Sequence, residues 1–109
     1  MKPVSFIGNS LDAVRSFPDC ARREAGFQID RLQRDLDPDD WKPMKTIGAG
    51  VREIRVRDAS GAFRVIYIAT LEDAVYILHA FQKKTEATSK RDLDLATTRF
   101  RDLMRRRRP

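Results

Sequence analysis

The stretch VREIRVRDASGAFRVIYIATLEDAVYILHAFQKKT, residues 51–85, decides the fold of this chain. Residues 51–57 alternate between apolar and charged side chains, which is typical of a strand with one buried face. Residues 63–69 and 74–82 are almost continuously apolar and rich in β-branched and aromatic residues, as strands covered on both faces are. Short polar turns separate the three runs. The pattern predicts an antiparallel meander of three strands.

Helical patterns flank this meander. A short apolar run near the N-terminus predicts one further strand, and a helix is expected next over residues 11–16. A second helix is expected from Pro18 to about Leu36, because apolar residues recur there every three or four positions. Ser89 as an N-cap, with Asp92 three residues later, predicts the start of a last amphipathic helix. The expected fold class is α+β, a small antiparallel β-sheet in the order β-α-α-β-β-β-α, packed by a helical hairpin and a C-terminal helix.

Length and composition restrict the class of protein. A chain of 109 residues is long enough for one hydrophobic core, so a single domain over residues 1–109 is expected. No apolar run approaches the roughly 20 residues of a membrane span, and the first residues lack a signal sequence, so a cytoplasmic protein without membrane contact is expected. One histidine and one cysteine cannot build the usual zinc site. The net charge of +6 favours nucleic acid or an acidic protein as a partner.

The predicted sheet carries a cluster of cations, and its members are Arg55, Arg64, Lys83 and Lys84. Arginine offers a planar fork of donors that matches phosphate oxygens in pairs, and lysine offers a point charge. Around one phosphodiester, such groups stabilise the negative charge that develops in the transition state, and losing one preorganised donor costs roughly 10²–10³ in rate. The alternative interpretation is a solvated cationic face paired with Glu53 or Asp58.

Two residues of the apolar strands are candidates for proton transfer. In simple alternation His79 shares a face with Val75 and Ile77, which favours a histidine of the core. A general acid or base is the alternative, because the unperturbed pKa of histidine, ~6.5, is close to neutral pH. Tyr67 either donates a hydrogen bond to a phosphate or packs in the core.

Three segments of the chain resemble one protein family. Residues 50–55 (GVREIR), 63–67 (FRVIY) and 75–85 (VYILHAFQKKT), in this order and spacing, are similar to toxins of bacterial toxin–antitoxin pairs. Within the RelE/ParE superfamily, the chain most resembles the HigB-like, phage-derived branch. Residues 41–45 (WKPMK) and 90–96 (KRDLDLA) also look like that branch, so the resemblance spans nearly the whole chain.

This resemblance implies a toxin that inhibits translation as a metal-independent, ribosome-dependent mRNA endonuclease that needs no cofactor. In RNase members of the family, the 2′-hydroxyl of one nucleotide attacks the adjacent phosphate and leaves a cyclic phosphate and a free 5′-hydroxyl. Carried over by position, Arg55 and Arg64 match residues that contact the scissile phosphate. Lys84 matches a basic position at the end of the last strand, with Lys83 beside it. The implied partners are the ribosome, mRNA and a cognate antitoxin with a helix-turn-helix.

The same resemblance leaves the general base unassigned. No tyrosine follows Tyr76, whereas some RelE members use one in the C-terminal segment, and the terminal Asp/His/Tyr group of some HigB members is missing. His79, Tyr67 and a neighbouring lysine are therefore the candidates.

Further RNA contacts are expected from basic residues around the cluster. Residues 41–45 are expected to form a loop, which carries Lys42 and Lys45, and Arg57 ends the first meander strand. Together with Lys83, these three residues are the expected RNA-binding set. Two other functions remain open from the sequence, a ParE-like toxin that poisons gyrase and a non-catalytic module that binds RNA or an antitoxin.

Overall fold

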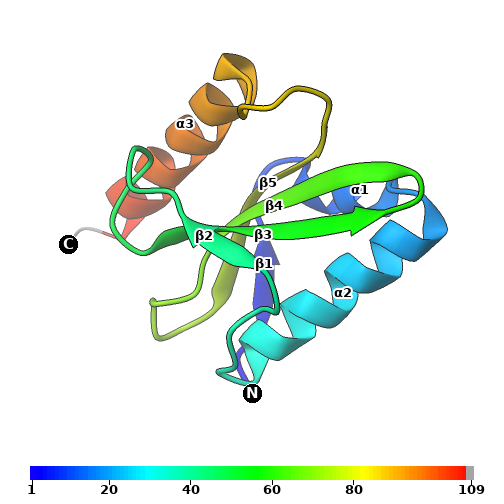
Figure 1. Ribbon diagram of the computed structural model, residues 1–109. Coiled ribbons are helices and arrows are strands. Elements are labelled where there is room, and N and C mark those ends of the chain that lie inside the picture. The colour runs from blue at the N-terminus through cyan, green and yellow to red at the C-terminus, as the bar shows by residue number, and fades with distance from the viewer. Residues whose placement is uncertain (108–109) are drawn as a thin grey trace.

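The computed structural model describes residues 1–107. A five-stranded sheet lies between helices on its two faces (Figure 1). The elements along the chain are β1 (Val4–Phe6), α1 (Ser10–Arg15), α2 (Asp19–Gln33), β2 (Trp41–Pro43), β3 (Val51–Asp58), β4 (Gly61–Ile68), β5 (Val75–Lys83) and α3 (Lys90–Arg106). The strand order is β1-β5-β4-β3-β2. The antiparallel neighbours β3, β4 and β5 confirm the predicted meander and the α+β class. No helix within this part of the chain is both long and apolar enough to cross a membrane.

The sheet is mixed and mostly antiparallel, and the parallel pair of β1 and β5 is the difference from the predicted antiparallel sheet. β1 pairs with β5 in parallel, with Val4 opposite Val75, because the chain returns to β5 through helices and the other strands rather than through a hairpin. The predicted loop contains an additional antiparallel edge strand, β2, with Lys42 opposite Glu53. Its three residues are too few to show a strand period. Pro43, which has no N–H to donate, suits such an edge position.

Two hydrophobic layers hold the helices to the sheet. The layer under α1 and α2 includes Ile54, Phe63 and Val65, whereas the layer under α3 includes Ile66 and Leu78. Figure 1 shows α2 and α3 on opposite sides of the sheet. Each of the two layers removes apolar side chains from water, and this burial is the main stabilising contribution.

α2 ends three residues earlier than predicted, at Gln33. Asp35 adopts a left-handed conformation with φ of 61°, and its N–H donates to the Leu32 carbonyl at 3.1 Å. The N–H of Leu36 donates to the Arg31 carbonyl at 2.9 Å. These two bonds form a Schellman motif, which satisfies the last carbonyls and turns the chain away. Leu36, expected in the apolar stripe, is therefore exposed.

Gly48 allows α3 to pack closely on the segment before β3. A Cβ at this position would lie 2.2 Å from Cε2 of Phe100. Gly48→Ala is therefore expected to lower the free energy of unfolding by about 1–3 kcal/mol, the usual cost of overpacking. Gly26→Ala is the matched control, because Gly26 lies in α2 with open space around it and alanine is the better helix former by about 1 kcal/mol. Urea unfolding measures both variants, and a Gly48→Ala variant as stable as the wild type would contradict this packing.

Candidate functional site

The strand register brings three of the predicted cations to one face of the sheet. Arg55 lies directly opposite Arg64 across β3 and β4, and Lys83 lies opposite Ala62, two residues along β4 from Arg64. Directly opposed residues have Cβ atoms about 4.5–5.5 Å apart. Lys84 follows the last residue of β5 and is exposed. We call the set Arg55, Arg64 and Lys83 the basic cluster.

The other predicted RNA-binding residues, Lys42, Lys45 and Arg57, do not all lie beside the basic cluster. Lys42 lies in β2 opposite Glu53, and Arg57 lies exposed on the cluster's face at the end of β3. Lys45 lies beyond β2 and lines a separate hollow beside that strand. The structure therefore brings Lys42 and Arg57 toward the basic cluster and leaves Lys45 outside it.

Arg64 is buried beneath this face and paired with Glu53. The two residues are 2% and 0% exposed, and Nε of Arg64 lies 3.4 Å from Oε1 of Glu53. Nη1 of Arg64 donates to the Phe63 carbonyl at 3.0 Å, and Thr88 Oγ1 donates to Oε2 of Glu53 at 3.3 Å. Burial lowers the pKa of Arg64, whereas Glu53 opposes this, and a guanidinium remains charged in proteins. Arg64 thus contributes positive charge from below the surface.

Glu53 is the part of the site that sequence reasoning underestimated. Strand alternation places Glu53 on the charged face, and the sequence suggested it only as one possible counter-ion of the cations there. The structure buries it completely, with Lys42 Nζ 4.0 Å from its Oε1. Strand periodicity gives the face but cannot show that Thr88, 35 residues away, lies over this carboxylate.

Lys83 and Arg55 are the half-buried, accessible members of the basic cluster. Burial lowers the pKa of Lys83, and the charge of Arg64 lowers it further, while Glu53 acts in the opposite direction. The cluster therefore groups cations that can bind an anion.

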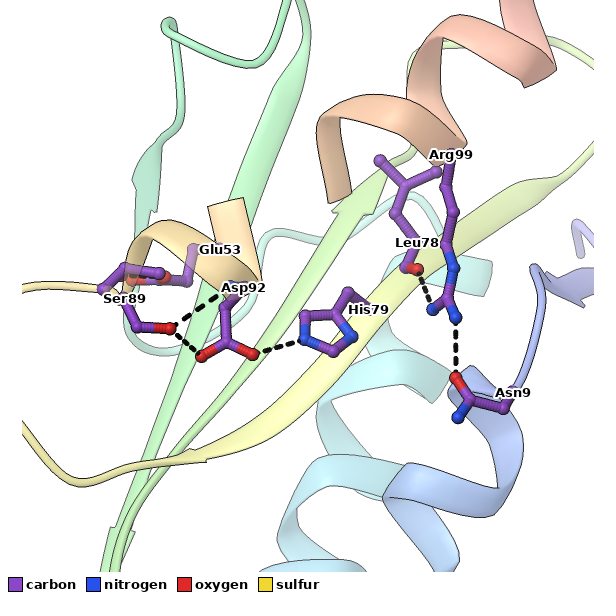
Figure 2. A network of polar contacts seen from close by, with 8 residues as sticks. Asn9, Glu53, Leu78, His79, Ser89, Asp92 and Arg99 are labelled. Atoms are coloured by element: carbon purple, nitrogen blue, oxygen red, sulfur yellow. Dashed lines mark hydrogen bonds and ion pairs between the residues drawn. The ribbon is translucent and has the colours of Figure 1, made fainter. Parts of the chain in front are cut away.

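His79 lies under the N-terminus of α3, where Asp92 binds it (Figure 2). Nε2 of His79 is 2.7 Å from Oδ1 of Asp92, and Ser89 Oγ donates to Oδ2 of Asp92 at 2.6 Å. Ser89 is the N-cap of α3, as predicted, and its Oγ accepts the Asp92 N–H at 3.2 Å. Asp92 was predicted only as a capping residue, so its bond to His79 was missed. The side chain of His79 is 7% exposed, and its bond to Asp92 joins β5 to α3 beside the basic cluster.

A β-bulge decides the face on which His79 lies. His79 pairs with Ile66, but Ile77 pairs with Tyr67, so Leu78 is an extra residue on β5. Leu78 and His79 therefore both face α3, and the prediction that His79 shares a face with Ile77 was wrong. Simple alternation fails wherever two residues of one strand oppose one of its neighbour.

Stability is expected to fall as the pH drops below about 6.5, through His79. Burial lowers the pKa of His79, although Asp92 acts in the opposite direction. The unfolded chain then takes up a proton at a higher pH than the folded chain, so the stabilising contribution is complete above the unfolded pKa and is lost below it. Urea unfolding at about pH 7.5 and about pH 5.5 measures the effect, and His79→Gln should reduce it. A wild type that becomes more stable in acid would contradict the assignment.

Tyr67 lies on the opposite face of the sheet from the basic cluster. It is fully buried in the layer under α1 and α2. Burial raises the pKa of Tyr67 to about 12. The prediction of Tyr67 as an acid–base residue is corrected on this basis, because the sheet itself separates it from the cluster.

Comparison with known protein families identifies the chain. The family described as "Phage derived protein Gp49-like (DUF891)" matches residues 12–101. The matched region includes α2, the three meander strands and the greater part of α3. A search of curated proteins finds no match. The matched region contains the whole basic cluster together with Glu53 and His79. The chain belongs to the phage-derived Gp49-like family, which is part of the RelE/ParE-like toxin group.

Proposed function

We propose that this protein is the toxin of a toxin–antitoxin pair, a HigB-like endoribonuclease that cuts mRNA on the ribosome. The observation that carries the proposal is the direct opposition of Arg55 and Arg64 across β3 and β4, with Lys83 on the same face. Grouped cations with paired donors bind phosphate oxygens strongly. Membership of a RelE-like toxin family supports the same function.

The proposed reaction is an intramolecular transfer of the phosphoryl group from the 5′-oxygen to the 2′-oxygen of the RNA. Lys83, as the neutral amine, takes the proton from a 2′-hydroxyl, whose oxygen attacks the adjacent phosphorus. The new P–O2′ bond forms as the P–O5′ bond breaks, and the departing 5′-oxygen takes a proton from water. The products are a 2′,3′-cyclic phosphate and a 5′-hydroxyl. Arg55 donates to the non-bridging oxygens, and the buried charge of Arg64 stabilises the same negative charge from below.

The proposed partners follow from the charge of this face. Lys42 and Arg57 extend the positive surface around the cluster and contact the RNA backbone. These phosphate contacts make RNA binding weaken as the salt concentration rises. A helix-turn-helix antitoxin would inactivate the toxin by laying carboxylates over the same cations, because complementary charge governs such pairing.

Adding the purified protein to programmed ribosomes tests the function. We expect cuts within the A-site codon, with cyclic phosphate and 5′-hydroxyl ends when the fragments are mapped. Intact mRNA would overturn the proposal. Broken DNA with intact mRNA in induced cells would indicate a gyrase poison, and RNA binding without turnover would indicate a non-catalytic module.

A further inference from the structure

A pocket of about 430 Å³ lies at the edge of β5, between the start of α1 and the N-terminus of α3. β1 pairs only with Val75–Ile77, so the pocket runs beside the later residues of β5, which β1 does not cover. Asn9 and Ala13 form the wall on the α1 side. The volume falls within the roughly 300–1,000 Å³ of small-molecule sites.

One end of the pocket is suited to an anion. Lys83, Lys84 and Arg91 line it, together with Ser89 at the N-cap of the 17-residue helix α3. Unpaired N–H groups and the helix dipole make such a terminus attractive to phosphate. Asp92 is the one acidic residue of the lining, and both its carboxylate oxygens are occupied by hydrogen bonds.

His79 supplies a second, independent feature of the pocket. Its side chain is 7% exposed and lines the pocket, and its Nδ1 is buried without a hydrogen-bond partner in residues 1–107. The Asp92 carboxylate can only accept, so Nε2 carries the hydrogen and Nδ1 of the neutral ring is an acceptor. Figure 2 shows Nδ1 turned away from Asp92, toward the side where Asn9 lies.

Arg99 fixes the walls around this acceptor. Its Nη1 donates to the Leu78 carbonyl at 2.9 Å, and its Nη2 donates to Oδ1 of Asn9 at 2.7 Å (Figure 2). One side chain of α3 thus holds both β5 and the residue before α1. The pocket is preformed by these contacts, which favours ligand binding because little ordering is left to the ligand.

We propose that this pocket binds a nucleotide of the RNA substrate beside the cleaved linkage. A phosphate of the RNA lies at the N-terminus of α3 near Lys84 and Arg91, and an N–H group of the base donates to Nδ1 of His79. Lys83 lines the pocket and belongs to the basic cluster, so the bound nucleotide is continuous with the phosphodiester held there. The inference rests on the proposed RNA cleavage and adds to it a base-binding subsite.

Binding of mononucleotides, followed by NMR on the isotope-labelled protein, tests the pocket without any cleavage. The ligands are AMP, purine riboside 5′-monophosphate, which lacks the amino group, and inorganic phosphate. We expect AMP to shift the ring nitrogens of His79 and the amides of Lys84 and Arg91. Purine riboside monophosphate should bind about tenfold more weakly, the effect of one lost hydrogen bond. Inorganic phosphate should shift only the amides at the start of α3.

A variant that fills the pocket gives the second arm of the test. Ala13→Leu places a larger side chain in the α1 wall, away from the basic cluster, and should weaken AMP binding at least tenfold. Ala59→Leu, in the exposed turn between β3 and β4, is the matched control and should bind as the wild type does. If Ala13→Leu does not fold, Lys84→Ala takes its place, with the same expected direction.

The outcomes separate this inference from the proposed function. Equal affinity for AMP and purine riboside monophosphate, or shifts confined to the strands that carry Arg55 and Arg64, would overturn the pocket even if the protein cleaves mRNA. Binding of AMP at His79 by a protein that leaves mRNA intact would overturn the nuclease and retain the nucleotide site.

Discussion

Arg64→Ala is expected to lower the free energy of unfolding by about 3–5 kcal/mol, because it leaves a buried carboxylate without its partner. Glu53 is fully buried, and its Oε1 has no hydrogen-bond partner in the part of the chain that the structure describes. The other nearby cation, Lys42, is half-exposed and its Nζ lies 4.0 Å away. Urea unfolding at neutral pH measures the loss.

A double variant distinguishes lost charge pairing from lost packing. Glu53→Met with Arg64→Met removes both charges and keeps apolar volume, so it should recover most of the stability, as apolar replacements of buried ion pairs often do. Arg57→Ala, which removes an exposed arginine of the same face, should change stability by less than about 0.5 kcal/mol. A double variant as unstable as Arg64→Ala would show that the pairing itself contributes little.

Arg55→Ala is expected to reduce mRNA cleavage by roughly 10²–10³ while leaving stability nearly unchanged. Arg55 is half-buried opposite Arg64, and no carboxylate within residues 1–107 forms an ion pair with it. Its removal therefore leaves no buried charge unpaired. It removes the accessible fork of donors that we assign to the non-bridging phosphate oxygens.

Cleavage rates on programmed ribosomes, with urea unfolding of the same preparations, check this expectation. Arg55→Lys keeps the charge but not the paired donors, so its rate should lie between those of Arg55→Ala and the wild type. Arg23→Ala, on the exposed side of α2, is the control and should cleave normally. Full activity of a folded Arg55→Ala protein would remove Arg55 from the proposed mechanism.

Local patterns in the sequence were sufficient for most of the architecture. Residues 51–57 alternate and the next two runs are apolar, which predicted β3, β4 and β5, and sequential strands usually pair. Ser89 was correctly expected to cap α3. The pairing of neighbouring strands also placed Arg55 and Arg64 on one sheet, and their register then brought them opposite each other.

The features that only tertiary structure decided are those that depend on residues far apart in the chain. The parallel pairing of β1 with β5, the edge strand β2 and the extra residue Leu78 are set by packing and hydrogen bonding to other elements. A strand period cannot encode them.

The same distinction holds within the candidate site. The sequence by itself determined which face carries the cations. The folded chain decided that Glu53 holds Arg64 below that face, that Lys83 lies on the face of Arg55, and that Asp92 binds His79. The physical reason is that burial and ion pairing arise from groups that meet only when α3 and its preceding loop close over the sheet.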